Sequence, residues 1–75
     1  MWNKVNAQKL ATELKILRGK KGWNQSTLAT KSGVSTACIQ FIEQNYDQRQ
    51  PRPITLIKIA NALEIKEEEL LKYIR

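Results

Sequence analysis

The chain has 75 residues, of which 41% are apolar, and a formal net charge of +6 at pH 7; we therefore expect one small domain, spanning residues 1–75, that an apolar core holds together. Its single cysteine excludes an internal disulfide, and the lack of histidine argues against a zinc site, so we expect neither metal nor cofactor and a reducing, cytoplasmic setting. No apolar run approaches the ~20 residues of a membrane span, and the amino terminus lacks the apolar core of a signal peptide, so we expect no membrane partner.

Basic residues are concentrated in the first part of the chain. Residues 1–31 contain seven Lys and Arg residues and one Glu, which accounts for the whole excess of +6, while residues 32–75 carry no net charge. A basic sector on a small domain indicates a polyanionic partner, because neutralised phosphates release counterions and thereby drive binding. A basic surface that only keeps the protein soluble is the alternative, and charge alone does not decide between the two.

A first helix is predicted from about residue 6 to Lys20. Its apolar residues recur at helical spacing on one face, which consists of Ala7, Leu10, Ala11, Leu14 and Leu17. Gly22 comes just beyond it, and a glycine there can adopt the left-handed backbone conformation that ends a helix.

Two further short helices are predicted on either side of Gly33. Asn24 is a good N-cap for a helix that runs to about Ser32, and Ser35 is a good N-cap for one that runs to about Gln44. The glycine between them supplies a left-handed backbone step at little steric cost, so one helix can end and the next begin almost at once.

The last third of the chain adds two more helices after a polar loop. Pro53 suits the first position of a helix, where its missing N–H is no loss. The broad apolar face of this fourth helix consists of Leu56, Ile57, Ile59, Ala60 and Leu63. A fifth helix is predicted from about Glu67 to Tyr73. Five short helices with almost no strand signal predict a compact all-α domain.

The two helices around Gly33 have the pattern of a helix-turn-helix. In such a unit the first helix braces across a DNA backbone while the second lies in the major groove, and the steep angle between them makes this possible. The pattern therefore predicts that the third helix binds DNA.

The residues of this unit resemble those of a known family, the Cro and phage-repressor class, often called the Xre family. The motif residues are Gln25, Leu28-Ala29, Ser32-Gly33-Val34-Ser35, Ile39 and Ile42-Glu43. The similar flanking residues are Leu17-Arg18, Gly22-Trp23-Asn24-Gln25, Pro51, Ile59-Ala60-Asn61-Ala62-Leu63 and Glu68-Glu69-Leu70. The resemblance therefore covers nearly the whole chain.

The resemblance implies a five-helix, lambda-repressor-like fold in which helices 2 and 3 form the helix-turn-helix. It also implies sequence-specific binding of double-stranded DNA by a transcriptional regulator, a repressor in particular, encoded by a bacterium, phage or plasmid. Since one reading helix covers only a few base pairs, we expect a homodimer, at least on DNA, and a two-fold symmetric operator. The chain departs from the family at Asn24, where many members have Thr, and in a longer loop before Pro51.

Base-reading residues are expected on the face of the third helix that turns away from Ile39 and Ile42. They are Thr36, Ala37, Gln40, Phe41 and Gln44. Thr36 and Gln40 offer hydrogen bonds to base edges, and Ala37 or Phe41 can contact a thymine methyl group. For Phe41 an alternative is that its ring packs sideways on Tyr46 or the following loop.

Phosphate contacts are expected at the helix starts, in the basic loop, and at an arginine near the end of the first helix. The candidates are Arg18, Asn24, Gln25, Ser35, Arg49 and Arg52. In the resembling family, the glutamine that matches Gln25 contacts DNA, and the residues that match Arg18 and Glu43 meet as a structural ion pair. The alternative for Arg18 and Glu43 is two separate surface charges.

Two other kinds of function remain possible on this scaffold. The chain could be the antitoxin of a toxin pair, with a toxin partner, or a protein-interaction module that does not read DNA. We do not expect an enzyme, because the sequence lacks a carboxylate pair, a phosphate-binding glycine loop and a metal-ligand set. Cys38 is a lone mid-helix cysteine without a histidine to activate it, so we expect it to be a small packing residue.

Overall fold

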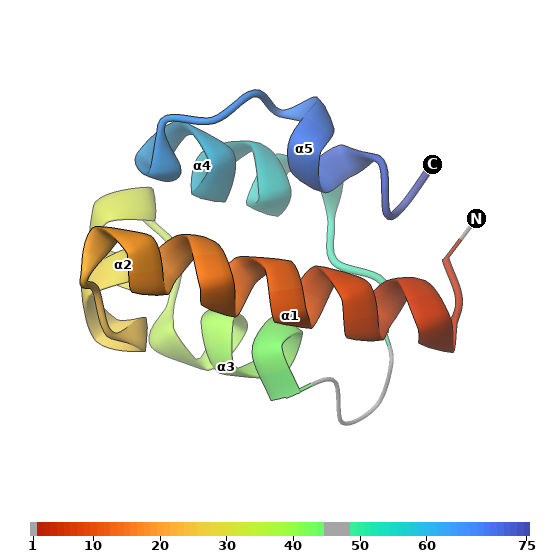
Figure 1. Ribbon diagram of the computed structural model, residues 1–75, viewed down its shortest axis with the longest axis horizontal. Helices are drawn as coiled ribbons and strands as arrows, with labels where there is room; N and C mark the ends of the chain where they lie inside the picture. The colour runs from red at the N-terminus through yellow and green to blue at the C-terminus, as the bar shows by residue number, and fades with distance from the viewer. Residues whose placement is uncertain (1, 45–48) are drawn as a thin grey trace.

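A computed structural model describes residues 2–44 and 49–75 of the chain. Within these ranges helices are the only regular elements: α1 (Lys4–Lys21), α2 (Gln25–Ser32), α3 (Thr36–Gln44), α4 (Pro53–Leu63) and α5 (Glu68–Leu71). In Figure 1, α1 lies across the front, with α2 at its left end, α3 below it, and α4 and α5 above it. The predicted five-helix, all-α fold is confirmed.

A side-chain cap marks the start of the first helix, and a glycine marks its end. The Asn3 side chain accepts a hydrogen bond from the Asn6 backbone N–H at 2.8 Å, so α1 begins at Lys4, earlier than predicted. Gly22 ends it in the left-handed conformation (φ 72°), and its N–H donates to the carbonyls of Arg18 and Gly19. The sequence did not reveal the amino-terminal cap because the apolar pattern starts only at Ala7.

The helix-turn-helix forms around Gly33 as predicted. The Asn24 side chain caps α2 by accepting a hydrogen bond from the Thr27 N–H at 2.8 Å, and the Ser35 hydroxyl caps α3 by accepting one from the Cys38 N–H at 3.0 Å. Gly33 lies between them with φ 76°, and its N–H donates to the Ala29 carbonyl. A residue with a Cβ would be strained in this conformation, so the glycine allows the sharp turn.

The fourth helix starts at Pro53, as predicted, and ends at a residue with unusual backbone geometry. Its C-cap is Glu64, which has φ 61° and ψ 40°, a left-handed conformation that non-glycine residues rarely adopt. The fifth helix is shorter than predicted: the N–H groups of Tyr73 and Ile74 donate to carbonyls only three residues back, so the chain leaves the α-helical pattern after Leu71.

All five helices contribute to one apolar core. The largest fully buried side chains are those of Leu10, Leu14, Leu28, Ile39, Leu56, Ile59 and Leu70. Helix α1 packs against α3 and α4, α2 packs against the same two helices, and α5 packs against α4. The core therefore fixes the position of α3 through its contacts with α1 and α2. Among the described residues, none of the helices has the length and apolarity needed to cross a membrane.

Candidate nucleic-acid interface

The third helix has one buried face and one face open to solvent. Ile39 and Ile42 are buried in the core, whereas Ala37, Gln40 and Gln44 are exposed. The side chain of the remaining polar candidate, Thr36, is half-buried at the start of the helix. The face that turns away from the isoleucines is therefore polar and accessible, as a groove-reading surface must be.

Phe41 lies on the face of α3 that the sequence analysis assigned to it, but it is less exposed than expected. It is half-buried and packs against the core instead of turning fully toward solvent. The Arg49 guanidinium lies over its ring, 5.7 Å from the ring centre. This arrangement resembles the alternative in which the ring packs sideways on the loop after α3; Tyr46, which that alternative also named, lies outside the described residues. At 100° per residue, position 41 points about 150° away from the centre of the buried face, so the ring is partly covered because it lies beside Cys38 and Arg49.

Glu43 is an acidic residue that is almost completely buried at the end of α3, with 2% of its surface exposed. Arg18 of α1 donates to both of its oxygens, from Nε to Oε2 at 2.8 Å and from Nη2 to Oε1 at 2.9 Å. The hydrogen bond with Glu43 raises the pKa of the Arg18 guanidinium, which keeps the guanidinium charged. The structure thus brings together the two residues expected to form an ion pair, and their contact joins α1 to α3.

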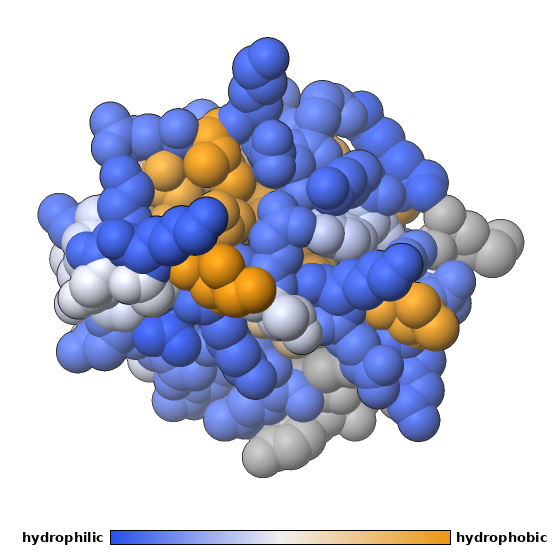
Figure 2. Space-filling view, in the orientation of Figure 1, coloured by the Kyte–Doolittle hydropathy of each residue, from blue (hydrophilic) through white to orange (hydrophobic). Residues whose placement is uncertain are grey.

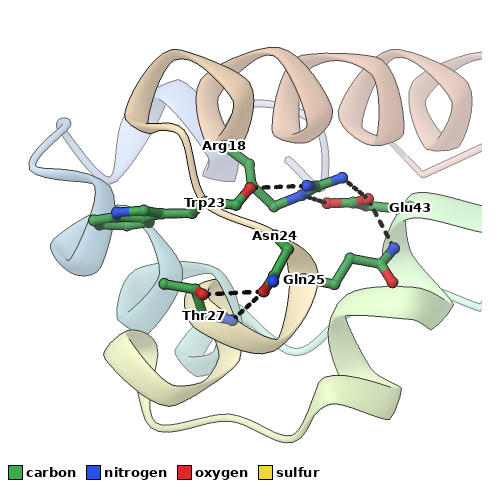
Figure 3. A network of polar contacts seen from close by, with 6 residues as sticks. All are labelled: Arg18, Trp23, Asn24, Gln25, Thr27 and Glu43. Carbon is green, nitrogen blue, oxygen red and sulfur yellow. Dashed lines mark hydrogen bonds and ion pairs between the residues drawn. The ribbon is translucent and has the colours of Figure 1, made fainter.

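Two further hydrogen bonds extend this ion pair into a network (Figure 3). Arg18 Nη1 donates to the Trp23 carbonyl at 3.0 Å, and Gln25 Nε2 donates to Glu43 Oε1 at 3.0 Å. Because a carboxylate paired with a guanidinium can only accept, Gln25 must turn its NH₂ group toward Glu43. The network therefore links the end of α1, the start of α2 and the end of α3.

The capping residues Asn24 and Ser35 are exposed at the starts of α2 and α3, and Asn24 lies beside this network (Figure 3). The Asn24 side chain accepts hydrogen bonds from both the backbone N–H and the hydroxyl of Thr27, and the Ser35 hydroxyl accepts one from the Cys38 N–H. Both side chains thus have a structural use as caps. Backbone N–H groups at a helix N-terminus attract anions, so the same positions suit a phosphate.

The two loop arginines lie beside the carboxyl-terminal half of α3. Arg49 and Arg52 are both exposed, and they line a hollow of about 310 Å³ together with Phe41 and Cys38. A second hollow connects α1 to the end of α3, and its walls include Lys4, Lys15 and Gln44. Basic side chains are therefore present on two sides of α3.

Cys38 behaves as a packing residue. Its side chain is half-buried against the core, and burial raises the pKa of its thiol, which disfavours the reactive thiolate. Among residues 2–44 and 49–75, no group of three or more His, Cys, Asp and Glu side chains could hold a metal ion.

The sequence analysis missed two contacts at this site. Gln25 was expected only as a phosphate contact, yet it also donates to Glu43. The contact between Phe41 and Arg49 was missed as well. A polar residue in the first turn of α2 near a predicted buried carboxylate was the available signal for Gln25, whereas no pattern in the sequence places a loop arginine over a particular ring.

Two short helices across a glycine turn, with a buried ion pair behind them and a polar face in front, define a helix-turn-helix domain. The sequence model of the family described as "Helix-turn-helix" matches residues 14–70, and the chain belongs to this family. The match confirms the resemblance to the Cro and phage-repressor class that the motif residues indicated.

Curated relatives support the same assignment. The chain is 44% identical over 59 residues to "HTH-type transcriptional regulator SutR" of Escherichia coli (strain K12), which is 79% of this chain and 32% of that protein. It is 39% identical over 56 residues, or 75% of this chain, to "Antitoxin HipB" of E. coli O6:H1 (strain CFT073) and of E. coli (strain K12), covering 57% and 61% of those proteins. The chain thus spans about a third of SutR and about three fifths of HipB. No solved structure gives a significant match.

Proposed function

We propose that the chain binds double-stranded DNA sequence-specifically as a transcriptional regulator, a repressor in particular, with α3 in the major groove. The observation that carries this proposal is the exposed polar face of α3, held at a fixed angle by the bonds from Arg18 and Gln25 to the buried Glu43. Because the reading helix is already held rigidly, its side chains can reach the bases without the entropy cost of ordering the helix when DNA binds. The family and the SutR relative support the same proposal.

In this proposal the exposed side chains of α3 read base edges. The amides of Gln40 and Gln44 can each donate to and accept from an adenine, and the Thr36 hydroxyl can pair with either kind of edge. The Ala37 methyl group fits against a thymine methyl. Phe41, half-buried beside Cys38, contributes from the rim of this surface by contact with a thymine methyl and by supporting Arg49.

The phosphate contacts in this proposal surround the reading face. They come from Arg18, Asn24, Gln25, Ser35, Arg49 and Arg52. Arg18 keeps one-fifth of its side chain exposed despite its bonds to Glu43, and Gln25 keeps a second amide N–H, so both have capacity for a phosphate oxygen. Phosphate contacts position the helix, whereas the α3 side chains provide the sequence preference.

The regulator acts in the cytoplasm as a homodimer on a two-fold operator. A single α3 has 9 residues and covers only a few base pairs, which gives too little discrimination against the large excess of other genomic sites. Two copies related by a two-fold axis would place their reading helices in successive major grooves of one DNA face, about 34 Å apart. No catalytic step or cofactor is needed for this function.

Binding to selected duplexes in rising salt tests the proposal. Duplexes with a randomised centre are selected for binding to the 75-residue chain. The affinity for the most enriched duplex is then measured from low to moderate salt. The logarithm of the affinity should fall linearly with the logarithm of the salt concentration, with a slope of about −0.9 for each phosphate contact. Failure to enrich any sequence, or an affinity that does not change with salt, would reject it.

A second candidate function is that of an antitoxin, and the similarity to HipB over 75% of this chain favours it. In this case the chain would bind a toxin protein in addition to DNA. The test is to express the gene next to its own, alone and together with this chain. The antitoxin role would be established if the neighbouring gene alone arrests growth, this chain relieves the arrest, and the two proteins form a complex. Normal growth with the neighbouring gene alone would reject the antitoxin role.

A further inference from the structure

The outward face of α1 carries apolar side chains where a surface helix is normally polar. At 100° per residue, Val5, Thr12 and Ile16 lie directly opposite the buried Leu14 and its neighbours. Val5 is 57% exposed and Ile16 is 53% exposed, and both are large hydrophobic residues. They are separated by three helical turns, so they form the ends of a stripe about 16 Å long.

A hollow lies beside this stripe and has a fixed wall. Its volume is about 480 Å³, and it is lined by Val5 and Ile16 from α1 and by Tyr73 from the carboxyl-terminal end of the chain. The Tyr73 hydroxyl donates a hydrogen bond to Glu13 of α1, and Lys72 lies 4.0 Å from the same carboxylate. These contacts hold the aromatic ring against α1, so the hollow exists before any ligand binds.

The rim of the hollow is basic. Of the six Lys and Arg residues of α1, Arg18 and Lys21 pair with Glu43 and Glu64. Glu13, the one acidic residue of α1, lines the hollow and pairs with Tyr73 and Lys72. Lys9 lines the hollow itself, and Lys20 follows Ile16 by four residues on the same face. Figure 2, which shows the side of the molecule where α1 lies in front, has separate orange, hydrophobic areas among blue, hydrophilic surface.

We propose that this face of α1 is a docking surface for an acidic amphipathic helix of a partner protein. The partner's apolar side chains, three or four residues apart, would enter the hollow between Val5, Ile16 and Tyr73, and its carboxylates would pair with Lys9 and Lys20. The surface belongs to α1 and the chain end and does not include the exposed face of α3. The proposal therefore goes beyond DNA binding and does not depend on it.

Charge and shape favour this occupant over a second copy of the chain or a membrane. Two copies that met through this face would bring Lys9 and Lys20 of one copy toward the same lysines of the other, and juxtaposed like charges disfavour association. A helix that lies on a membrane buries a broad apolar face rich in Trp, Phe and Leu. The broad apolar face of α1 is already buried in the core, and only a narrow stripe remains outside.

Titration with a designed peptide tests the proposal. The probe is a helical peptide about 14 residues long, the length of roughly four turns, with leucines along one face and glutamates elsewhere. A peptide of the same composition in scrambled order is its control. Calorimetry measures binding to the whole chain and to two variants, Ile16→Gln and Ile54→Gln. The second is the matched control, because Ile54 on α4 is 54% exposed and does not line the hollow.

The proposal predicts that the amphipathic peptide binds the natural chain, binds Ile16→Gln about tenfold more weakly, and binds Ile54→Gln unchanged. Both variants should have the melting temperature and the DNA affinity of the natural chain, which separates this result from a failure of the DNA-binding proposal. Absent binding, equal binding of the scrambled peptide, or equal weakening by both substitutions would overturn it. So would tighter binding to phosphatidylglycerol vesicles than to the peptide, or self-association of the natural chain that Ile16→Gln abolishes.

Discussion

The buried ion pair gives the sharpest energetic prediction, since the Glu43 side chain is 1% exposed and that of Arg18 is 20% exposed. Glu43→Gln removes the negative charge: the remaining amide oxygen and the Trp23 carbonyl can still accept from the guanidinium, but no counter-charge balances this largely buried cation. Breaking a fully buried pair costs about 3–5 kcal/mol. Because water still reaches one-fifth of Arg18, we expect about 2–3 kcal/mol for this substitution.

Arg18→Met should cost more than Glu43→Gln. It leaves the buried carboxylate with only the Gln25 amide, so we expect the full cost of a stranded charge, about 3–4 kcal/mol. The double variant has neither charge and should recover about 2 kcal/mol relative to the sum of the single losses. For a chain of this size, the loss in Glu43→Gln lowers the melting temperature by roughly 10–20 °C.

Urea denaturation of the four proteins, followed by circular dichroism, measures this coupling. Equal slopes with urea concentration in all four proteins would show that the denatured states expose similar surface, so that the free energies can be compared. If the single losses add within about 0.5 kcal/mol, the two residues do not interact as the structure indicates, and the rigid link between α1 and α3 is refuted.

Three further predictions concern other parts of the structure. Glu64→Gly should raise the melting temperature by roughly 2–5 °C, because it relieves the left-handed conformation at φ 61° and loses only an exposed ion pair; a lower melting temperature in a calorimetric scan would contradict this. Burial and the hydrogen bond to Glu13 raise the pKa of Tyr73 from 10.0 to about 12. The neutral phenol therefore stabilises the folded state below pH 10, and this contribution is lost as the pH rises through 12. Urea denaturation at a series of pH values should show that Tyr73→Phe lacks this part of the alkaline loss of stability. Phe41→Ala should lower the free energy of unfolding by about 1–2 kcal/mol, because the ring is half-buried. It should also weaken DNA binding through the loss of its contact with Arg49, so the double variant with Arg49→Gln should lose less affinity than the sum of the two single losses.

The sequence predicted those elements whose signals are local. Asn24, Gly33, Ser35 and Pro53 each act through the backbone next to them, and all four occupy the predicted cap, turn or first position. The early start of α1 was missed because Asn3 acts alone, without an apolar pattern beside it.

Contacts between distant residues were harder to predict. Arg18 and Glu43 are 25 positions apart, and only the resemblance to a family indicated that they meet. The placement of Phe41 was partly wrong because helical spacing assigns a direction but not the neighbours that a loop brings to it. The left-handed Glu64 has no sequence signal, since glycine or asparagine is the usual residue at such a position.

The central claim is that the exposed face of α3 reads DNA bases, and a specificity ratio tests it most directly. The ratio compares the affinity for a selected duplex with that for a scrambled duplex of the same composition, at one fixed salt concentration. Gln40→Ala should lower this ratio roughly five- to hundredfold while leaving the affinity for the scrambled duplex nearly unchanged. Asn61→Ala, an exposed residue of α4, should leave both affinities as they are. A ratio that Gln40→Ala does not change would contradict the claim.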